Sequence, residues 1–261
     1  RPPRSTPLYS SAASDVYKRQ ILEVVKKTTE KCFVPLTVGG GVRSHEDAYK
    51  LLRAGADKVA LNTAAIHQPD LISQAARTFG SSTIVVSIEA IKKSNGEYEA
   101  YTDNGRESTG INAIEWAGRA AELGAGEVLV TSIGREGTKK GFDLDLTGSI
   151  AKLLSIPVIA CGGGGTMQHV DQVISLGKAN AVCLASMFHY HYLKSFNNGS
   201  LFVQEGNVEF LSLASRGEPL ACPDISLMLK YTTGKFLNLK LNTNASPVSY
   251  THLTLPTNRE V

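Results

Sequence analysis

Short apolar runs alternate with amphipathic segments along the middle of the chain. Continuous apolar runs bounded by turn residues are typical of strands buried on both faces of a sheet. Six such runs lie at 34–38, 58–61, 83–89, 127–132, 156–161 and 180–186. Segments with helical spacing separate them, among them 44–56, 69–80 and 112–124. This order predicts an α/β fold with a parallel sheet made from about six βα units.

Several residues mark where these elements begin and end. Ser44, with Asp47 three positions later, is expected to cap a helix, and Pro69 and Gly80 to open and close the next one. The dipeptide at 104–105, Asn-Gly, predicts a β-hairpin inserted after the third strand.

An internal repeat favours a barrel over an open, doubly wound sheet. LTVGGGVRS (36–44) matches IACGGGGTM (159–167), and ADKVALNTA (56–64) matches KANAVCLASM (178–187). At one constant offset, Gly39 lies over Gly162 and Asp57 over Asn180. Duplication of a half-barrel explains this pattern, whereas the GxGxxG signature of a dinucleotide fold is absent. We therefore expect an incomplete (βα)8 TIM barrel.

Both glycine-rich loops, 39–41 and 162–165, follow a strand and precede a helix. Glycine lets the backbone approach an anion, and a helix N-terminus offers free N–H groups. A ligand-free turn explains one such loop equally well, but the two together predict a substrate with a phosphate at each end.

Other candidate residues stand at strand ends and in one polar loop. Glu89 ends a strand at the position where barrel enzymes carry acid–base groups, although a rim carboxylate in solvent is the alternative. Glu136 and Gly137, in the loop 134–143, are candidates for substrate contact or parts of a linker. Lys58 and Glu127 begin their strands, and by themselves indicate a surface ion pair.

Composition narrows the class of partner. Lys and Arg total 27 against 24 Asp and Glu, and the resulting charge of +3 lies entirely within residues 1–20. The charge therefore gives no reason to expect nucleic acid, and no apolar run is long enough for a membrane helix. The four cysteines lack zinc spacing, and the pair at 189 and 191, both His, lacks a third ligand, so no metal is expected.

Residues 1–20 and 247–261 lack the periodicity of the middle. We expect both to be non-native flanking segments, and 21–246 to be the domain, with an insertion at 194–224.

Five segments resemble one known family over about residues 21–193. PLTVGGGVRSHEDAYKLLRAGADKVALNTAAI, AYTDNGRESTG, LGAGEVLVTS, REGTKKGFD and LASMFH are similar to the cyclase subunit of imidazole glycerol-phosphate synthase. The resemblance implies a cytoplasmic TIM-barrel lyase of histidine biosynthesis, without a cofactor. It also implies a glutaminase partner that delivers ammonia within a heterodimer. The implied substrate is a bis-phosphorylated formimino-aminoimidazole-carboxamide ribonucleotide, and the products are imidazole glycerol phosphate and an aminoimidazole-carboxamide ribonucleotide.

The same resemblance implies roles for individual residues. It implies that Glu89 is catalytic and that Lys58 and Glu127 belong to an ammonia gate. Groups that bind the substrate and its two phosphates fall on Gly40, Gly41, Asn62, Thr63, Thr131, Glu136, Gly137, Gly163, Gly164 and Ser186.

The chain also departs from the family pattern. Glu89 stands where an Asp is usual, and Gly134 replaces another Asp. The family's first two strands, one with a second catalytic Asp, are not found in this sequence. We therefore expect a six-stranded sheet with two unpaired edges, and no activity from residues 21–246 alone.

Three related functions remain alternatives. A homologous barrel amidates a sugar in surface-polysaccharide synthesis with the same ammonia chemistry. A related phosphoribosyl isomerase needs no ammonia, which the Lys58 and Glu127 pair and the hairpin disfavour. A non-catalytic barrel that binds a glutaminase is compatible with Glu89 and Gly134.

Overall fold

Seven parallel strands form the main sheet of the computed structural model, which describes residues 21–185, 187–188 and 241–244. Across the sheet they follow the order β8 (Ala181–Cys183), β7 (Val158–Cys161), β6 (Glu127–Ser132), β3 (Ile84–Lys92), β2 (Lys58–Leu61), β1 (Leu36–Gly39) and β9 (Leu241–Asn244). All six predicted strands are confirmed, as is the incomplete barrel. The predicted end segments 1–20 and 247–261, the insertion at 194–224, and the residues at 186, 189 and 191 lie outside the described residues.

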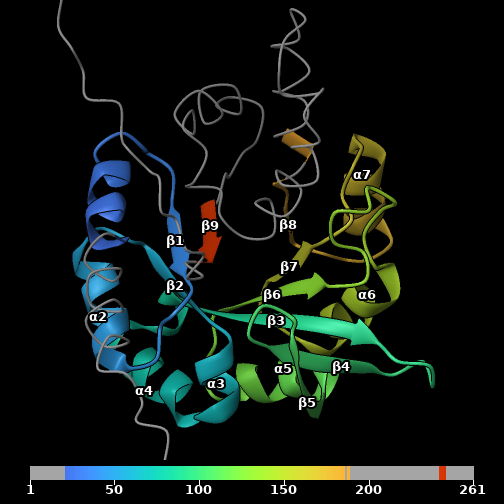
Figure 1. Cartoon of the computed structure of the whole chain (residues 1–261), viewed down its shortest axis with the longest axis horizontal. Coiled ribbons are helices and arrows are strands. Elements are labelled where there is room, and N and C mark those ends of the chain that lie inside the picture. Colours follow the sequence, from blue (N-terminus) through green and yellow to red (C-terminus); the bar gives the residue numbers. More distant parts are fainter. Residues whose placement is uncertain (1–20, 186, 189–240, 245–261) are drawn as a thin grey trace, which may run out of the picture.

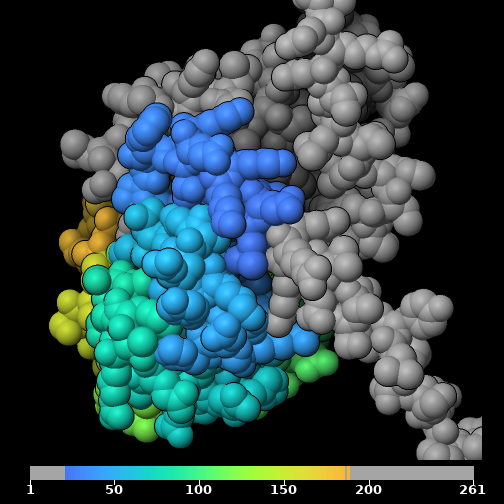
Figure 2. All heavy atoms as spheres, turned by 90° about the vertical axis from the view of Figure 1, so that its left-hand side faces the viewer, coloured from blue at the N-terminus to red at the C-terminus, as the bar shows by residue number. Residues whose placement is uncertain are grey.

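The sheet curls, and helices cover its outer face (Figure 1). After a helical segment at 21–29, the main helices are α2 (His45–Arg53), α4 (Asp70–Phe79), α5 (Ala113–Glu122), α6 (Leu144–Leu153) and α7 (Met167–Ser175). Helix α2 contacts α4, α5 contacts α6, and α6 contacts α7, so neighbouring helices pack side by side. Figure 2 shows the first units of this outer layer as one continuous surface.

Alternate strand residues are buried in two separate layers. Side chains such as Val59, Val86 and Val128 face the helices and form the large outer core. The intervening residues point to the concave side, because successive side chains of a strand lie on opposite faces. They form a second cluster from Ala60, Val85, Leu129 and Ile159, with Cys161, Ala181 and Cys183 packed against it. Burial on both faces explains why the strands are continuous apolar runs.

The predicted helix and turn signals have the expected geometry. The Ser44 side chain accepts a hydrogen bond from the Asp47 N–H at 3.2 Å and caps α2. Gly80 ends α4 with φ of +89°, in the left-handed region that favours glycine. The hairpin is also confirmed, with β4 (Tyr98–Thr102) and β5 (Glu107–Asn112) joined by a turn with positive φ at 103–105.

The sequence pattern did not predict one short helix or the full length of one strand. The short helix α3 (Thr63–His67) lies where only a turn was expected, because five residues are too few to show a helical period. Strand β3 also continues past Glu89 to Lys92 and pairs antiparallel with β4. The hairpin therefore extends the sheet beyond the barrel rim.

The two halves of the repeat have the same elements, as predicted. In the glycine loop and the helix after it, however, the structurally equivalent residues differ by one position from the predicted alignment. The glycines with positive φ are Gly40 and Gly41 in one loop, and Gly162 and Gly163 in the other. Gly40 therefore corresponds to Gly162, and the proposed pairing of Gly39 with Gly162 is wrong. The N-caps agree, since the Thr166 side chain caps α7 as the Ser44 side chain caps α2.

The second half of the repeat keeps the predicted pairing. The Asp57 carboxylate accepts a hydrogen bond from the N–H of Leu36 at 2.7 Å, and the Asn180 amide oxygen accepts one from Val158 at 2.9 Å. Each side chain holds the start of the preceding strand. The extra residue of the second unit therefore lies between α7 and Asn180, in a turn where Lys178 has φ of +56°.

The expectation of two unpaired edges is wrong for β1. Strand β9 pairs with it in parallel, from Leu36 opposite Leu241 to Gly39 opposite Asn244. The segment LNTN has no apolar period that marks it as a strand, and backbone pairing requires none. Strand β8 has β7 as its one partner within the described part of the chain.

We expect Gly126→Ala to lower the free energy of unfolding by about 1–3 kcal/mol, because an added Cβ overlaps the Ser81 carbonyl oxygen. Gly134→Ala is the matched control, with no heavy atom within 4 Å of its Cβ and an expected change below about 0.5 kcal/mol. Urea unfolding of both variants measures the difference, and equal stabilities would contradict the close packing of Gly126 against the backbone of Ser81.

Candidate active site

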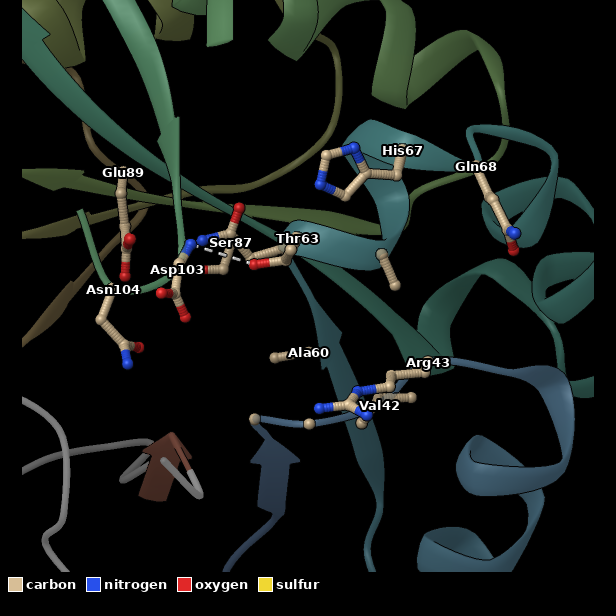
Figure 3. Close-up of a pocket in the computed structure, with 14 residues that line it drawn as sticks. Val42, Arg43, Ala60, Thr63, His67, Gln68, Ser87, Glu89, Asp103 and Asn104 are labelled. Atoms are coloured by element: carbon tan, nitrogen blue, oxygen red, sulfur yellow. Dashed lines mark hydrogen bonds between the residues drawn. The ribbon is translucent and has the colours of Figure 1, made fainter. Parts of the chain in front are cut away.

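A pocket of about 410 Å³ opens at the carboxyl ends of β1, β2 and β3 (Figure 3). It brings together five residues that the sequence analysis selected separately. These are Gly40, Gly41, Asn62, Thr63 and Glu89. They come from three successive strands, whose carboxyl ends meet at one edge of a parallel sheet. Binding and acid–base groups at this edge are characteristic of barrel enzymes.

The glycine loop forms one wall of the pocket. Gly40 and Gly41 have φ of +92° and +67°, conformations that residues with a Cβ adopt at a cost. A Cβ on Gly39 would lie 2.7 Å from that of Ala60, so β1 and β2 approach closely here. Helix α2 begins directly after this loop, and its first N–H groups are suited to an anion.

Asn62 and Thr63 follow β2 and connect it to the hairpin. The Thr63 hydroxyl accepts a hydrogen bond from the N–H of Asp103 at 3.2 Å, drawn as the dashed line in Figure 3. The buried Asn62 amide oxygen has no hydrogen-bond partner among the described residues. An unpartnered acceptor in a pocket is costly unless a donor from a ligand or water satisfies it.

The hairpin contributes two pocket residues that the sequence analysis did not select. Asp103 and Asn104 line the pocket, and Figure 3 shows Asn104 on the same side as Glu89. The Asn-Gly turn signal identified the hairpin, but not the direction in which its tip folds. Its position depends on the antiparallel pairing of β3 with β4. Arg43, His67 and Gln68 also line the pocket and were not selected.

Glu89 is buried, with 8% of its surface exposed. Burial, and secondarily the negative charge of Glu136, raise its pKa to about 7, against 4.5 for an ordinary Glu. Hydrogen bonds from the Gly105 N–H and the Asn62 side chain partly offset this rise in pKa. A carboxyl group that titrates near neutral pH can both donate and accept a proton, as general acid–base catalysis requires.

The second set of predicted residues lies on the neighbouring strands and loops. Thr131 stands opposite Glu89 in the pairing of β3 with β6. The loop 134–143, which carries Glu136 and Gly137, folds back against the second glycine loop, where the Gly141 N–H donates to the Gly163 carbonyl at 2.8 Å. These residues do not line the pocket around Glu89.

Backbone packing requires glycine at Gly163 in the second loop, because a Cβ there would overlap the Gly141 carbonyl oxygen. A Cβ on Gly164 would meet only the ends of the Leu184 and Phe142 side chains. Gly163 therefore has a structural role whether or not it contacts a ligand. The remaining predicted residue of this group, Ser186, lies outside the described residues.

Lys58 and Glu127 form an ion pair, with 2.6 Å between the Lys58 Nζ and a Glu127 carboxylate oxygen. Their side chains are 18% and 9% exposed, so the pair is largely buried and the surface alternative is wrong. Both lie at the amino ends of their strands, on the face that carries Ala60 and Leu129 further along. The pair therefore lies at the end of the concave face opposite the pocket.

Neither a metal centre nor a membrane span is found in the part of the chain that the structure describes. Its His, Cys, Asp and Glu side chains form no group of three that could hold a metal ion. None of its helices combines the length and apolar character needed to cross a membrane.

The fold and the pocket define a class of protein: a barrel of the (βα) type with a buried carboxylate and a glycine loop at the carboxyl rim. Sequence comparison identifies the family. Residues 11–194 match the family described as "Histidine biosynthesis protein". The chain is also 47% identical, over 171 residues, to the imidazole glycerol phosphate synthase subunit HisF of Alkaliphilus metalliredigens, covering 66% of this chain and 68% of that relative. The chain belongs to the histidine biosynthesis protein family.

We expect Lys58→Met to lower the free energy of unfolding by about 3 kcal/mol, because a largely buried Glu127 carboxylate loses its cation. Lys50→Met is the matched control, since Lys50 and Glu46 form an exposed pair at 3.3 Å whose loss costs below about 1 kcal/mol. Chemical denaturation at neutral pH compares the two. A loss for Lys58→Met no greater than the control would show that the buried pair adds nothing to stability.

The raised pKa of Glu89 predicts a pH-dependent stability. Between pH 4.5 and about 7 the folded protein holds a proton at Glu89 that the unfolded chain releases, so this contribution to stability is lost as pH rises. Glu89→Gln removes the titration. The free energy of unfolding of the parent chain should therefore fall relative to that of Glu89→Gln as pH rises. Between pH 4.5 and pH 8 this difference should change by about 3 kcal/mol in favour of the variant.

Urea unfolding across this pH range measures that difference. A difference between Glu89→Gln and the parent chain that does not change with pH would contradict the raised pKa of Glu89.

Proposed function

We propose that this chain is the cyclase subunit of an imidazole glycerol-phosphate synthase. One observation carries the proposal: in a member of this family, Glu89 is buried near the carboxyl end of β3, in a pocket shared with a glycine loop. The relative from Alkaliphilus, which bears that name, supports it. The substrate in this proposal is the bis-phosphorylated formimino-aminoimidazole-carboxamide ribonucleotide.

The two substrate phosphates are proposed to bind at the two halves of the repeat. Backbone amides at Gly40 and Gly41 and the side chains of Asn62 and Thr63 suit one phosphate, because they surround a single pocket beside the start of α2. The second phosphate and the adjoining part of the substrate are assigned to the other half of the rim, at Thr131, Glu136, Gly137, Gly163, Gly164 and Ser186.

Glu89 is proposed to move protons during ring closure and cleavage of the C–N bond. Its pKa of about 7 leaves both protonation states populated at neutral pH, so it can donate a proton in one step and accept one in another. Its longer side chain fits this role only if it reaches the same reacting atoms as the family's usual Asp. Its carboxyl group forms hydrogen bonds with the Asn62 side chain and the backbone N–H of Gly105, which hold it in the pocket.

Ammonia is proposed to enter at the opposite end of the concave face. Lys58 and Glu127 lie there as a largely buried ion pair, on the same face as the inner apolar layer. An ion pair that opens and closes can admit a small neutral molecule while excluding bulk water. A glutaminase subunit docked at this end, in a cytoplasmic heterodimer, would supply the ammonia.

We expect Glu89→Gln to lower kcat with ammonium salts by about 10² or more, because an amide cannot exchange the proton. The resemblance implies a second catalytic carboxylate on a first strand that is not found in this sequence. Catalysis is therefore measured in a chimera, in which residue 21 of this chain follows the first two βα units of the Alkaliphilus relative. In this chimera, Glu89→Asp should retain activity.

Glu115→Gln on the exposed face of α5 is the matched control and should leave kcat unchanged. Equal turnover by the Glu89→Gln variant would remove Glu89 from the mechanism. No turnover by the parent chimera, together with binding of a glutaminase, would instead identify a non-catalytic barrel.

A further inference from the structure

Two thiols lie side by side on the concave face of the sheet. Cys161 ends β7 and Cys183 ends β8, and they are paired residues in the register of these strands. Both side chains pack against the inner apolar layer and so point to the same side. Each is a half-buried free cysteine. Neither has a part in the proposed reaction.

The strand register brings the two residues within the range of a disulfide bond. Paired residues of neighbouring strands lie about 4.8 Å apart. Cysteines joined by a disulfide have Cα atoms about 4.4–6.8 Å apart, with Cβ atoms near 3.8 Å. Rotation of the two side chains and a small approach of the strand ends therefore suffice to connect Cys161 and Cys183.

The two thiols are chemically unequal. A hydrogen bond from the Cys161 thiol lowers the pKa of Cys183, although burial and the negative charge of Glu136 oppose this effect. The same hydrogen bond raises the pKa of Cys161 well above the usual value for a thiol. Cys183 is therefore the thiol that ionises first and attacks, and Cys161 is the thiol that responds second.

Metal binding accounts less well for this pair. A structural zinc site needs four ligands, and no group of three His, Cys, Asp or Glu ligands occurs among the described residues. The thiol of Cys32 lies elsewhere, 3.8 Å from the Val34 carbonyl near the start of β1. Cys161 and Cys183 therefore form a separate pair with the chemistry of a dithiol.

We propose that Cys161 and Cys183 form a redox-sensitive dithiol, which a low-molecular-weight disulfide converts to an intramolecular disulfide. The Cys183 thiolate attacks one sulfur of the small disulfide, forming a mixed disulfide and releasing one small thiolate. The Cys161 sulfur then attacks the Cys183 sulfur, the bond to the small thiol breaks, and a second small thiolate leaves. The two protons lost from the cysteines protonate the two released thiolates, and the small disulfide is the oxidant.

This cross-link would join the ends of β7 and β8 at the base of the second glycine loop. Cys161 directly precedes Gly162, which has φ of +91° and lies where a Cβ would be 2.7 Å from the Ser132 carbonyl oxygen. The inference does not depend on the proposed function, because it rests on the strand register and the thiols alone.

The test uses the full chain with Cys32→Ser and Cys222→Ser, so that only the proposed pair can react. After incubation with oxidised glutathione at neutral pH, both free thiols should be lost. The mass of the intact protein should fall by two hydrogen atoms, and dithiothreitol should restore both thiols. Retention of both thiols, or a stable gain of glutathione without a cross-link, would overturn the proposal.

Single variants in the same background provide matched controls. With Cys161→Ser or Cys183→Ser, the remaining thiol should gain one glutathione and form no internal cross-link. In the Cys161→Ser variant, the serine hydroxyl can still donate a hydrogen bond to the Cys183 sulfur. If the parent background gives the same mass gain as these variants, the two cysteines act independently and the proposal is wrong.

Discussion

The parallel backbone ladder is the constraint on which the rest of this structure depends. Because the strands run in one direction and stay in register, their carboxyl ends lie at one edge and their side chains alternate between two faces. One face packs against helices and the other forms the inner layer. The pocket and the dithiol lie at the carboxyl end of the concave face, and the ion pair lies at its amino end; all three follow from this arrangement.

Burial has opposite consequences at the two ends of that face. At the amino end, the Lys58 Nζ lies 2.6 Å from a Glu127 carboxylate oxygen and compensates its charge. At the carboxyl end, Glu89 lies near Glu136, which is also negative, and its pKa rises. A carboxylate paired with a cation is structurally stable but chemically inert near neutral pH. A carboxylate without one costs stability and gains the ability to exchange a proton, which links the stability cost of Glu89 to its proposed role.

The repeat shows how the same local rules build both halves of the rim. Ser44 and Thr166 cap equivalent helices, and Asp57 and Asn180 hold the starts of equivalent strands. The halves differ in what covers their glycines. The first loop borders an open pocket, whereas Gly163 in the second packs under the loop 134–143. A glycine pattern alone does not distinguish these situations, because close packing and ligand approach both exclude a Cβ.

The sequence by itself determined the local structure: six strands, the cap at Ser44 and the hairpin turn. These follow from interactions over a few residues, namely apolar periodicity, side-chain caps and glycine conformations. Only the tertiary structure decided that Asp103 and Asn104 border the pocket of Glu89, that the ion pair of Lys58 and Glu127 is largely buried, and that β9 pairs with β1. Each depends on strand order, register and burial, which join residues far apart in the chain through packing that no local pattern encodes.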